Sequence, residues 1–67
     1  MTPEQAHLLA KRIYGPRPES QRLGQWAFNC LLDMLPELAN EIRANYKLDP
    51  FYNDSRMTAF EEYILRA

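Results

Sequence analysis

The strongest hydrophobic pattern in the chain lies between residues 20 and 35. Apolar residues recur there every three or four positions in two adjacent rows, which is typical of an α-helix that is covered on several sides. The rows contain Leu23, Trp26, Ala27, Cys30, Leu31 and Met34, and then Phe28, Leu32 and Leu35. A narrow polar strip remains: Gln21, Arg22, Gln25, Asn29 and Asp33. We therefore predict a central, mostly apolar helix over residues 20–35.

A first helix is predicted over residues 3–14. Thr2 and Gln5 have the spacing of a capping box, and Pro3 suits the first helical position. Gly15 is expected to end the helix in the left-handed conformation, and Pro16 cannot continue it. Its apolar stripe is narrow: Ala6, Leu9, Ala10 and Ile13.

Two more helices are predicted over residues 36–46 and 55–66. Pro36 begins the former, and Tyr46 would close its inner stripe. The latter begins at a second capping-box match, residues 58–61, or one turn earlier at Asp54 or Ser55. Residues 47–53 between them are predicted to form an ordered turn. Asp49, Asn53 and the adjacent Asp54 can bond their own backbone there. The prediction is one all-α domain over residues 1–67, a compact bundle of three to four short helices.

Length and composition limit the kinds of core, partner and location that the chain can have. The chain has 67 residues, one cysteine and a formal net charge of −1, so it can form one small core and no disulfide framework. Cys30 is expected in the core, because free cysteine is among the most buried residue types. The weak negative charge argues against nucleic acid as a partner, because it gives no attraction to phosphate. No apolar run approaches the length of a membrane span and no export signal is evident, so we expect a cytoplasmic protein.

Catalytic and metal-binding patterns are weak. His7 is the only histidine, and it is expected to be an exposed side chain on the first helix. Residues 49–60 resemble an acidic calcium loop in composition, but Asp54 stands where such a loop needs glycine and Phe60 where it needs glutamate. We predict no metal, no cofactor and no enzymatic activity.

Two features are candidates for partner binding. Arg22, Gln25 and Asn29 align on one side of the central helix; they either face solvent, bond the turn, or meet a partner. Phe51 and Tyr52 lie in the turn between Asp49 and Asp54, where they either cover the core or serve as aromatic anchors. The candidate partner-binding set is Arg22, Gln25, Asn29, Asp49, Phe51, Tyr52 and Asp54.

A resemblance rests on several of these residues. Residues 22–25 read RLGQ and are followed by Asn29, residues 36–39 read PELA, and residues 49–54 read DPFYND, with Phe60 beyond. This pattern resembles a group of short, mostly uncharacterised bacterial and phage proteins. The resemblance implies a recurrent small fold and a mobile-element origin, and it assigns no site residue.

The functional expectation is therefore a non-enzymatic protein-binding module, a phage or prophage accessory factor that binds and modulates a host protein. A homodimer is expected as well, because the central helix has more apolar surface than three short helices readily cover. The alternative is a small DNA-binding transcriptional regulator that uses the helices at 20–35 and 36–46. Only Arg43 and Lys47 are basic near the second of these helices.

Overall fold

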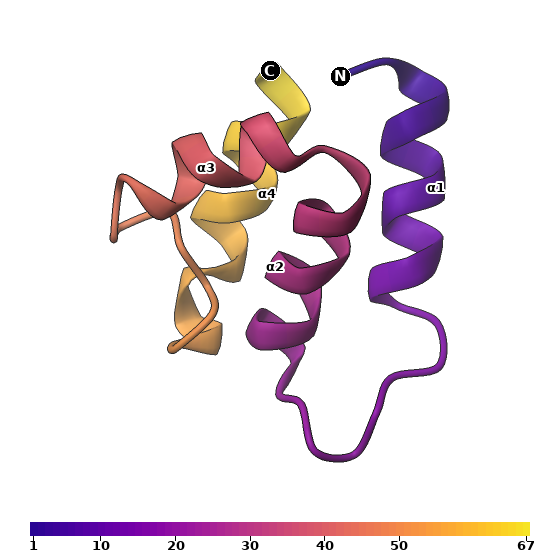
Figure 1. Cartoon of the computed structure of the whole chain (residues 1–67), viewed down its shortest axis with the longest axis vertical. Coiled ribbons are helices and arrows are strands. Elements are labelled where there is room, and N and C mark those ends of the chain that lie inside the picture. Colours follow the sequence, from indigo (N-terminus) through magenta and orange to yellow (C-terminus); the bar gives the residue numbers. More distant parts are fainter.

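Four α-helices and one short 3₁₀ turn form the chain in the computed structural model, which describes residues 1–67. The helices are α1 (Pro3–Ile13), α2 (Leu23–Met34), α3 (Pro36–Arg43) and α4 (Met57–Arg66), and the 3₁₀ turn η1 (Asp54–Arg56) leads into α4. No β-strand is present. The predicted small all-α bundle is therefore confirmed (Figure 1).

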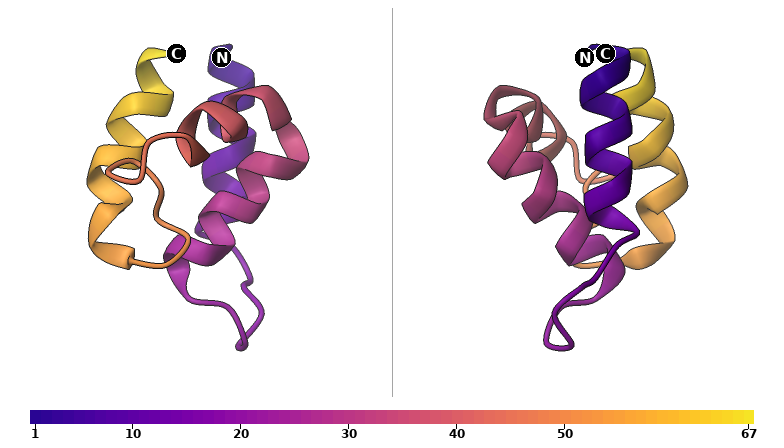
Figure 2. Two further views of the ribbon diagram at one scale, coloured as in Figure 1. Left: turned by 60° about the vertical axis from the view of Figure 1, so that its left-hand side comes forward. Right: turned by 90° about the vertical axis from the view of Figure 1, so that its right-hand side faces the viewer.

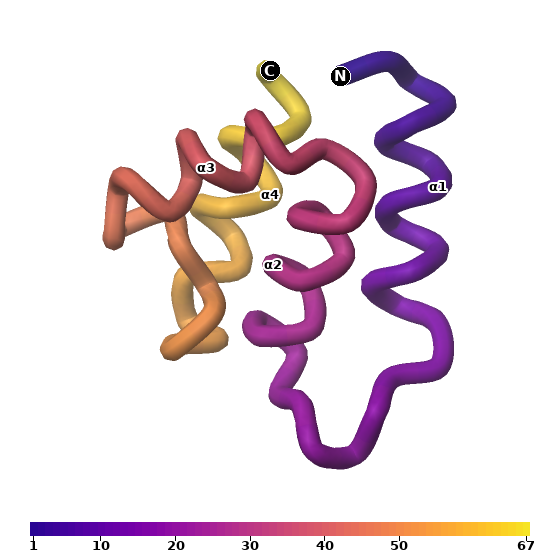
Figure 3. Tube along the Cα trace, viewed as in Figure 1, coloured from indigo at the N-terminus to yellow at the C-terminus, as the bar shows by residue number.

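The bundle is arranged around α2. α1 runs beside α2 on one side, and α3 turns back sharply at Leu35 and crosses towards α4 (Figures 1 and 2). Two long connections complete the trace: residues 14–22 loop out below the bundle, and residues 44–53 run from the end of α3 past the start of α2 to η1 (Figure 3). The two chain ends lie side by side, where the Met1 nitrogen donates to the Ala67 carbonyl oxygen.

One hydrophobic core joins all four helices. Cys30 is completely buried within it, which confirms the prediction for that residue. The core consists of Leu9, Ile13, Ala27, Phe28, Cys30, Leu31, Ala39, Ile42, Met57, Phe60 and Ile64.

The prediction that α2 keeps a surplus of uncovered apolar surface is wrong. Every apolar side chain of α2 is buried or half-buried, because α1, α3 and the 44–53 connection cover it from different sides. The large apolar side chains that are exposed lie on other segments: Leu8, Tyr14, Tyr46, Tyr52, Tyr63 and Leu65. The main argument for a dimer through α2 is thereby removed.

α1 begins as predicted and ends differently. Thr2 and Gln5 form the complete capping box, with their side chains and backbone nitrogens bonded reciprocally. Gly15 does not adopt the left-handed conformation, since no residue in the chain has a positive φ. A glycine is nevertheless required there, because a Cβ atom would lie 2.6 Å from the carbonyl oxygen of Lys11.

α2 and α3 are shorter than predicted. The backbone nitrogen of Gln21 donates to the carbonyl oxygen of Pro18 at 3.1 Å, so residues 18–21 form a turn and α2 starts only after Arg22. α3 ends at Arg43, where the chain passes into turns. Tyr46 is consequently 67% exposed, and its predicted place on an inner stripe is wrong.

The start of α4 is set by Asn53. The Asn53 side-chain oxygen accepts a hydrogen bond from the backbone nitrogen of Ser55 at 2.9 Å, which begins η1 and then α4. The helical segment thus begins at Asp54, the earlier of the two predicted starts, but as a 3₁₀ turn, and the α-helix itself begins only at Met57. The capping box at Thr58 does not form, because that residue already lies within α4.

Candidate functional site

The turn of residues 49–54, which we call the 49–54 turn, is held by its own short contacts. Asp49 Oδ1 accepts a hydrogen bond from the backbone nitrogen of Phe51 at 2.9 Å. The backbone nitrogen of Asn53 donates to the carbonyl oxygen of Pro50 at 3.1 Å. Pro50 is fully buried, so the turn is anchored in the molecule at its second residue. The predicted ordered turn is present, and Asp49 and Asn53 bond nearby backbone as expected.

Asp54 acts differently from the prediction. Its Oδ1 atom accepts a hydrogen bond from the backbone nitrogen of Gly24 at 2.9 Å. Gly24 is the second residue of α2, a helix whose N-cap residue, Arg22, supplies no side-chain cap. A carboxylate from a distant segment therefore satisfies one of the free N–H groups at the start of α2, where the helix dipole also favours negative charge.

Arg22 holds the other side of the same turn. Its Nη2 atom donates to the carbonyl oxygen of Phe51 at 2.8 Å, and its Nη1 atom lies 3.4 Å from Asp54 Oδ1. The guanidinium thus contacts two residues of the turn. We call the contacts of Arg22 and Gly24 with Phe51 and Asp54 the α2–turn brace.

Gly24 is a residue whose role the sequence reasoning missed. A Cβ atom at this position would overlap the carbonyl oxygen of Pro50 and lie 2.9 Å from Asp54 Oδ1. The turn can approach α2 this closely only because the position has no side chain. The signal available in the sequence was an isolated glycine near the start of a predicted helix, but nothing identified the segment that approaches it.

The predicted polar strip on α2 divides into parts with different contacts. Arg22 reaches the 49–54 turn, whereas Asn29 donates from Nδ2 to Gln21 Oε1 at 2.9 Å and stabilises the segment that enters α2. Gln25 is half-buried and makes no hydrogen bond with the turn. Of the three strip residues in the candidate partner-binding set, only Arg22 therefore belongs to the α2–turn brace.

Phe51 and Tyr52 have opposite environments. The Phe51 ring is half-buried and packs edge-on against Phe28 of the core, with centroids 5.9 Å apart and planes at 88°. The Tyr52 ring lies 4.7 Å from the Phe51 ring but is 80% exposed, the highest exposure of any large apolar side chain here. Phe51 covers the core, and Tyr52 is presented to solvent on top of it.

A surface hollow of about 260 Å³ adjoins these two rings. Its walls include Asp49 and Arg43, and the Arg43 guanidinium carbon lies 5.4 Å above the centre of the Phe28 ring. Arg43 forms no ion pair within 4.0 Å, so its donors remain free for another group. Arg43 was not among the predicted site residues, because its sequence position at the end of a helix gave no indication that it meets the turn.

The titratable groups with shifted pKa values lie away from this turn. The hydrogen bond that Tyr14 donates to Glu61 raises the pKa of Tyr14 to about 12, and a bond to Glu41 raises the pKa of Tyr63. Burial raises the pKa of the Cys30 thiol. His7 is exposed on α1, and no group of three or more His, Cys, Asp or Glu side chains is placed to hold a metal ion.

The chain was compared with known protein families, curated proteins and solved structures. No family model, no curated protein and no solved structure matches the chain. None of its helices has the length and apolar character that crossing a membrane requires. The resemblance to short bacterial and phage proteins stays a prediction, and the motif residues that carry it now have structural positions: Arg22, Gly24 and Asp54 form the α2–turn brace.

Proposed function

We propose that the chain is a non-enzymatic protein-binding module, a phage or prophage accessory factor that binds and modulates a host protein in the cytoplasm. The binding element is the 49–54 turn together with Arg43. The observation that carries the proposal is the 80% exposure of Tyr52 on a turn that is fixed at both sides.

The chemistry of this surface suits a protein partner. Tyrosine and arginine dominate the residues whose removal most weakens protein interfaces, because they combine apolar area with hydrogen-bonding groups. Tyr52 offers its ring and hydroxyl, Phe51 supports the ring from beneath, and Arg43 offers free N–H donors beside it. A partner segment with an apolar side chain next to a carboxylate would satisfy both residues.

The rigidity of the 49–54 turn supports the same proposal. A loop that must be ordered on binding loses part of its interaction energy to that ordering. Here Asp54, Arg22 and buried Pro50 fix the turn before any partner arrives. Tyr52 is thus held in place at little entropic cost.

A DNA-binding regulator built on α2 and α3 is less well supported. α3 would be the helix that enters the major groove, and its exposed positions include Glu37, Glu41 and Arg43. Two carboxylates on that helix would face the phosphate backbone, which repels them. α2 buries its apolar face in the core and contains no lysine or arginine. It would therefore contribute no DNA-binding surface beside α3.

The experiment is affinity capture from a host lysate with the wild type, Tyr52→Ala and Tyr46→Ala. Tyr46 is a matched control, since it is also a tyrosine of the 44–53 connection and is 67% exposed. We expect one host protein to be retained by the wild type and by Tyr46→Ala and to be lost with Tyr52→Ala. Equal retention by Tyr52→Ala, or no retained protein, would contradict the proposal. Circular dichroism of each variant checks that its helices are intact.

A further inference from the structure

A second hollow, of about 610 Å³, lies at the other end of α3. Met34, Leu35 and Leu38 provide its apolar surface, and all three are half-buried against the core. Gln5 of α1 and the two terminal residues, Met1 and Ala67, complete its walls, and the hollow is open to solvent. It shares no residue with the 49–54 turn.

Two carboxylates border this hollow. Glu37 and Glu41 are exposed and lie four positions apart, so they stand on the same side of α3 one turn from each other. Neither forms an ion pair, and no lysine or arginine lines the hollow. Glu41 accepts only a hydrogen bond from the Tyr63 hydroxyl, at 3.2 Å. The N-terminal ammonium of Met1 also borders the hollow, where it donates to the Ala67 carbonyl oxygen. The surface is therefore apolar in the middle and negative along its α3 edge.

We propose that this hollow binds an amphipathic helix of another protein that carries two basic residues one turn apart beside an apolar stripe. Packed along α3, such a helix would place its apolar side chains over Leu35 and Leu38. Lysine or arginine residues three or four positions apart would then match the spacing of Glu37 and Glu41. This surface is separate from the Tyr52 surface and takes a partner segment of opposite charge.

A second copy of this chain does not fit the description. Its lysine and arginine residues within helices are Lys11, Arg12, Arg43, Arg56 and Arg66, and no two of them are three or four positions apart. Arg12 is also engaged, since its Nη1 atom lies 2.8 Å from Asp33 Oδ2. The occupant is consequently a different protein.

The test uses synthetic helical peptides of about 18 residues, long enough to form four to five turns. One peptide has a leucine stripe flanked by lysines, a second has the same leucines flanked by glutamates, and a third keeps the lysines but replaces the leucines with serine. Each is titrated into the isotope-labelled full chain, and backbone amide chemical shifts locate the site. We expect only the first peptide to bind, with the largest shifts at Leu35, Leu38 and Glu41.

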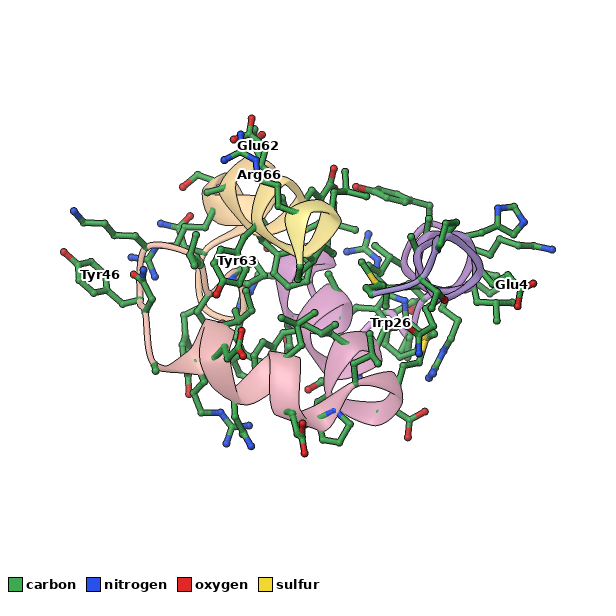
Figure 4. The ribbon with its side chains drawn as sticks, turned by 90° about the horizontal axis from the view of Figure 1, so that it is seen from above. Glu4, Trp26, Tyr46, Glu62, Tyr63 and Arg66 are labelled. Carbon is green, nitrogen blue, oxygen red and sulfur yellow. The ribbon has the colours of Figure 1, made fainter.

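Charge reversal provides the decisive variant. In Glu37→Lys/Glu41→Lys we expect the lysine peptide to bind about tenfold or more weakly, given the modest strength of each exposed ion pair, and the glutamate peptide to bind instead. The matched control is Glu4→Lys/Glu62→Lys, which changes the net charge equally. Glu4 and Glu62 point away from α3, from the far side of α1 and the opposite edge of α4 (Figure 4). Tyr52→Ala should leave peptide binding unchanged, which separates this site from the proposed function.

Several results would overturn the proposal. They are equal binding of the lysine and glutamate peptides, absence of binding, shifts centred on other residues, and equal weakening by the control variant. Concentration-dependent shifts at Leu38 in the chain alone would identify a second copy as the occupant and would overturn it as well. Glu37→Gln/Glu41→Gln keeps the test valid if the reversed variant unfolds, and we expect an intermediate loss of affinity.

Discussion

Asp54 Oδ1 accepts a hydrogen bond from the backbone nitrogen of Gly24 at 2.9 Å, across 30 residues of sequence. A helix start is usually capped by a side chain next to it, but α2 has no such cap. The carboxylate also lies near the guanidinium of Arg22, so one side chain links a helix, a turn and a cation.

Removal of the Asp54 carboxylate should destabilise the fold. We expect Asp54→Ala to lower the free energy of unfolding by about 1–2 kcal/mol, because a helix cap and a favourable dipole interaction are lost together. Asp54→Asn keeps an oxygen acceptor and should lose less. Urea unfolding followed by circular dichroism measures both. Glu62→Ala, at an exposed position of α4, is the control and should change little. An effect of Asp54→Ala no larger than that of the control would contradict the capping role.

Gly24→Ala should reverse the usual sign of a glycine-to-alanine change in a helix. Alanine normally stabilises a helix by about 1 kcal/mol relative to glycine. Here its Cβ would overlap the carbonyl oxygen of Pro50, so we expect a net loss of roughly 2 kcal/mol or more, from the cost of overpacking. Thermal unfolding compared with Asn40→Ala, an exposed position of α3, measures the difference. A stabilised Gly24→Ala protein would show that the turn does not lie against α2.

The neighbouring aromatic residues of the turn should differ in their effect on stability. Phe51→Ala removes a half-buried ring from contact with Phe28, and we expect a loss of about 2 kcal/mol, below the range for fully buried aromatics. Tyr52→Ala removes an exposed ring and should change stability by no more than about 0.5 kcal/mol. Chemical denaturation of the two variants tests this directly. Similar losses for both would mean that Tyr52 is also part of the core.

We expect the free energy of unfolding to decrease at alkaline pH because of the ionisation of Tyr14. Its pKa is raised to about 12 in the folded chain, above the ordinary tyrosine value of 10.0, by the hydrogen bond that it donates to Glu61. The contribution is complete below about pH 10, where both states keep the proton. Between pH 10 and 12 the unfolded state loses the proton first, so stability decreases as pH rises. Unfolding free energies of the wild type and Tyr14→Phe should converge across this range, and parallel curves would contradict it.

The homodimer expected from the sequence stays a prediction, and α2 is not the surface that would form it. α2 is covered within the monomer, whereas Leu8 on α1 and Leu65 on α4 are 54% and 70% exposed. We expect any self-association to depend on these leucines and to be reduced in Leu8→Lys/Leu65→Lys. Sedimentation velocity at high micromolar concentration measures it. A wild type that remains monomeric under these conditions would contradict the homodimer.

Local signals in the sequence were sufficient for some elements. The start of α1 depends on Thr2 and Gln5, three positions apart, and was predicted correctly. The burial of Cys30 followed from its place in the apolar pattern of α2. In each case the residues that determine the structure are close together in the chain, so that spacing alone carries the information.

Long-range contacts were not predictable in the same way. Asp54 was expected to bond its own backbone, and nothing near it in the chain indicates that its partner is Gly24. Phe51 and Tyr52 are adjacent and similar in size, so the sequence could not show which ring packs on Phe28. The start of α2 was placed too early because the turn at residues 18–21 lacks a strong breaker of its own after Pro18.

The cap on α2 has a consequence for how the chain folds during synthesis. The backbone nitrogen of Gly24 has its hydrogen-bond acceptor, the Asp54 carboxylate, 30 residues downstream. The first turn of α2 therefore gains this cap only after Asp54 has left the ribosome. The start of α2 and the 49–54 turn should then form late and together, as one cooperative unit, while the distant end of α2 can pack earlier. The backbone amide of Gly24 would report this order directly in a hydrogen-exchange experiment on chains of increasing length.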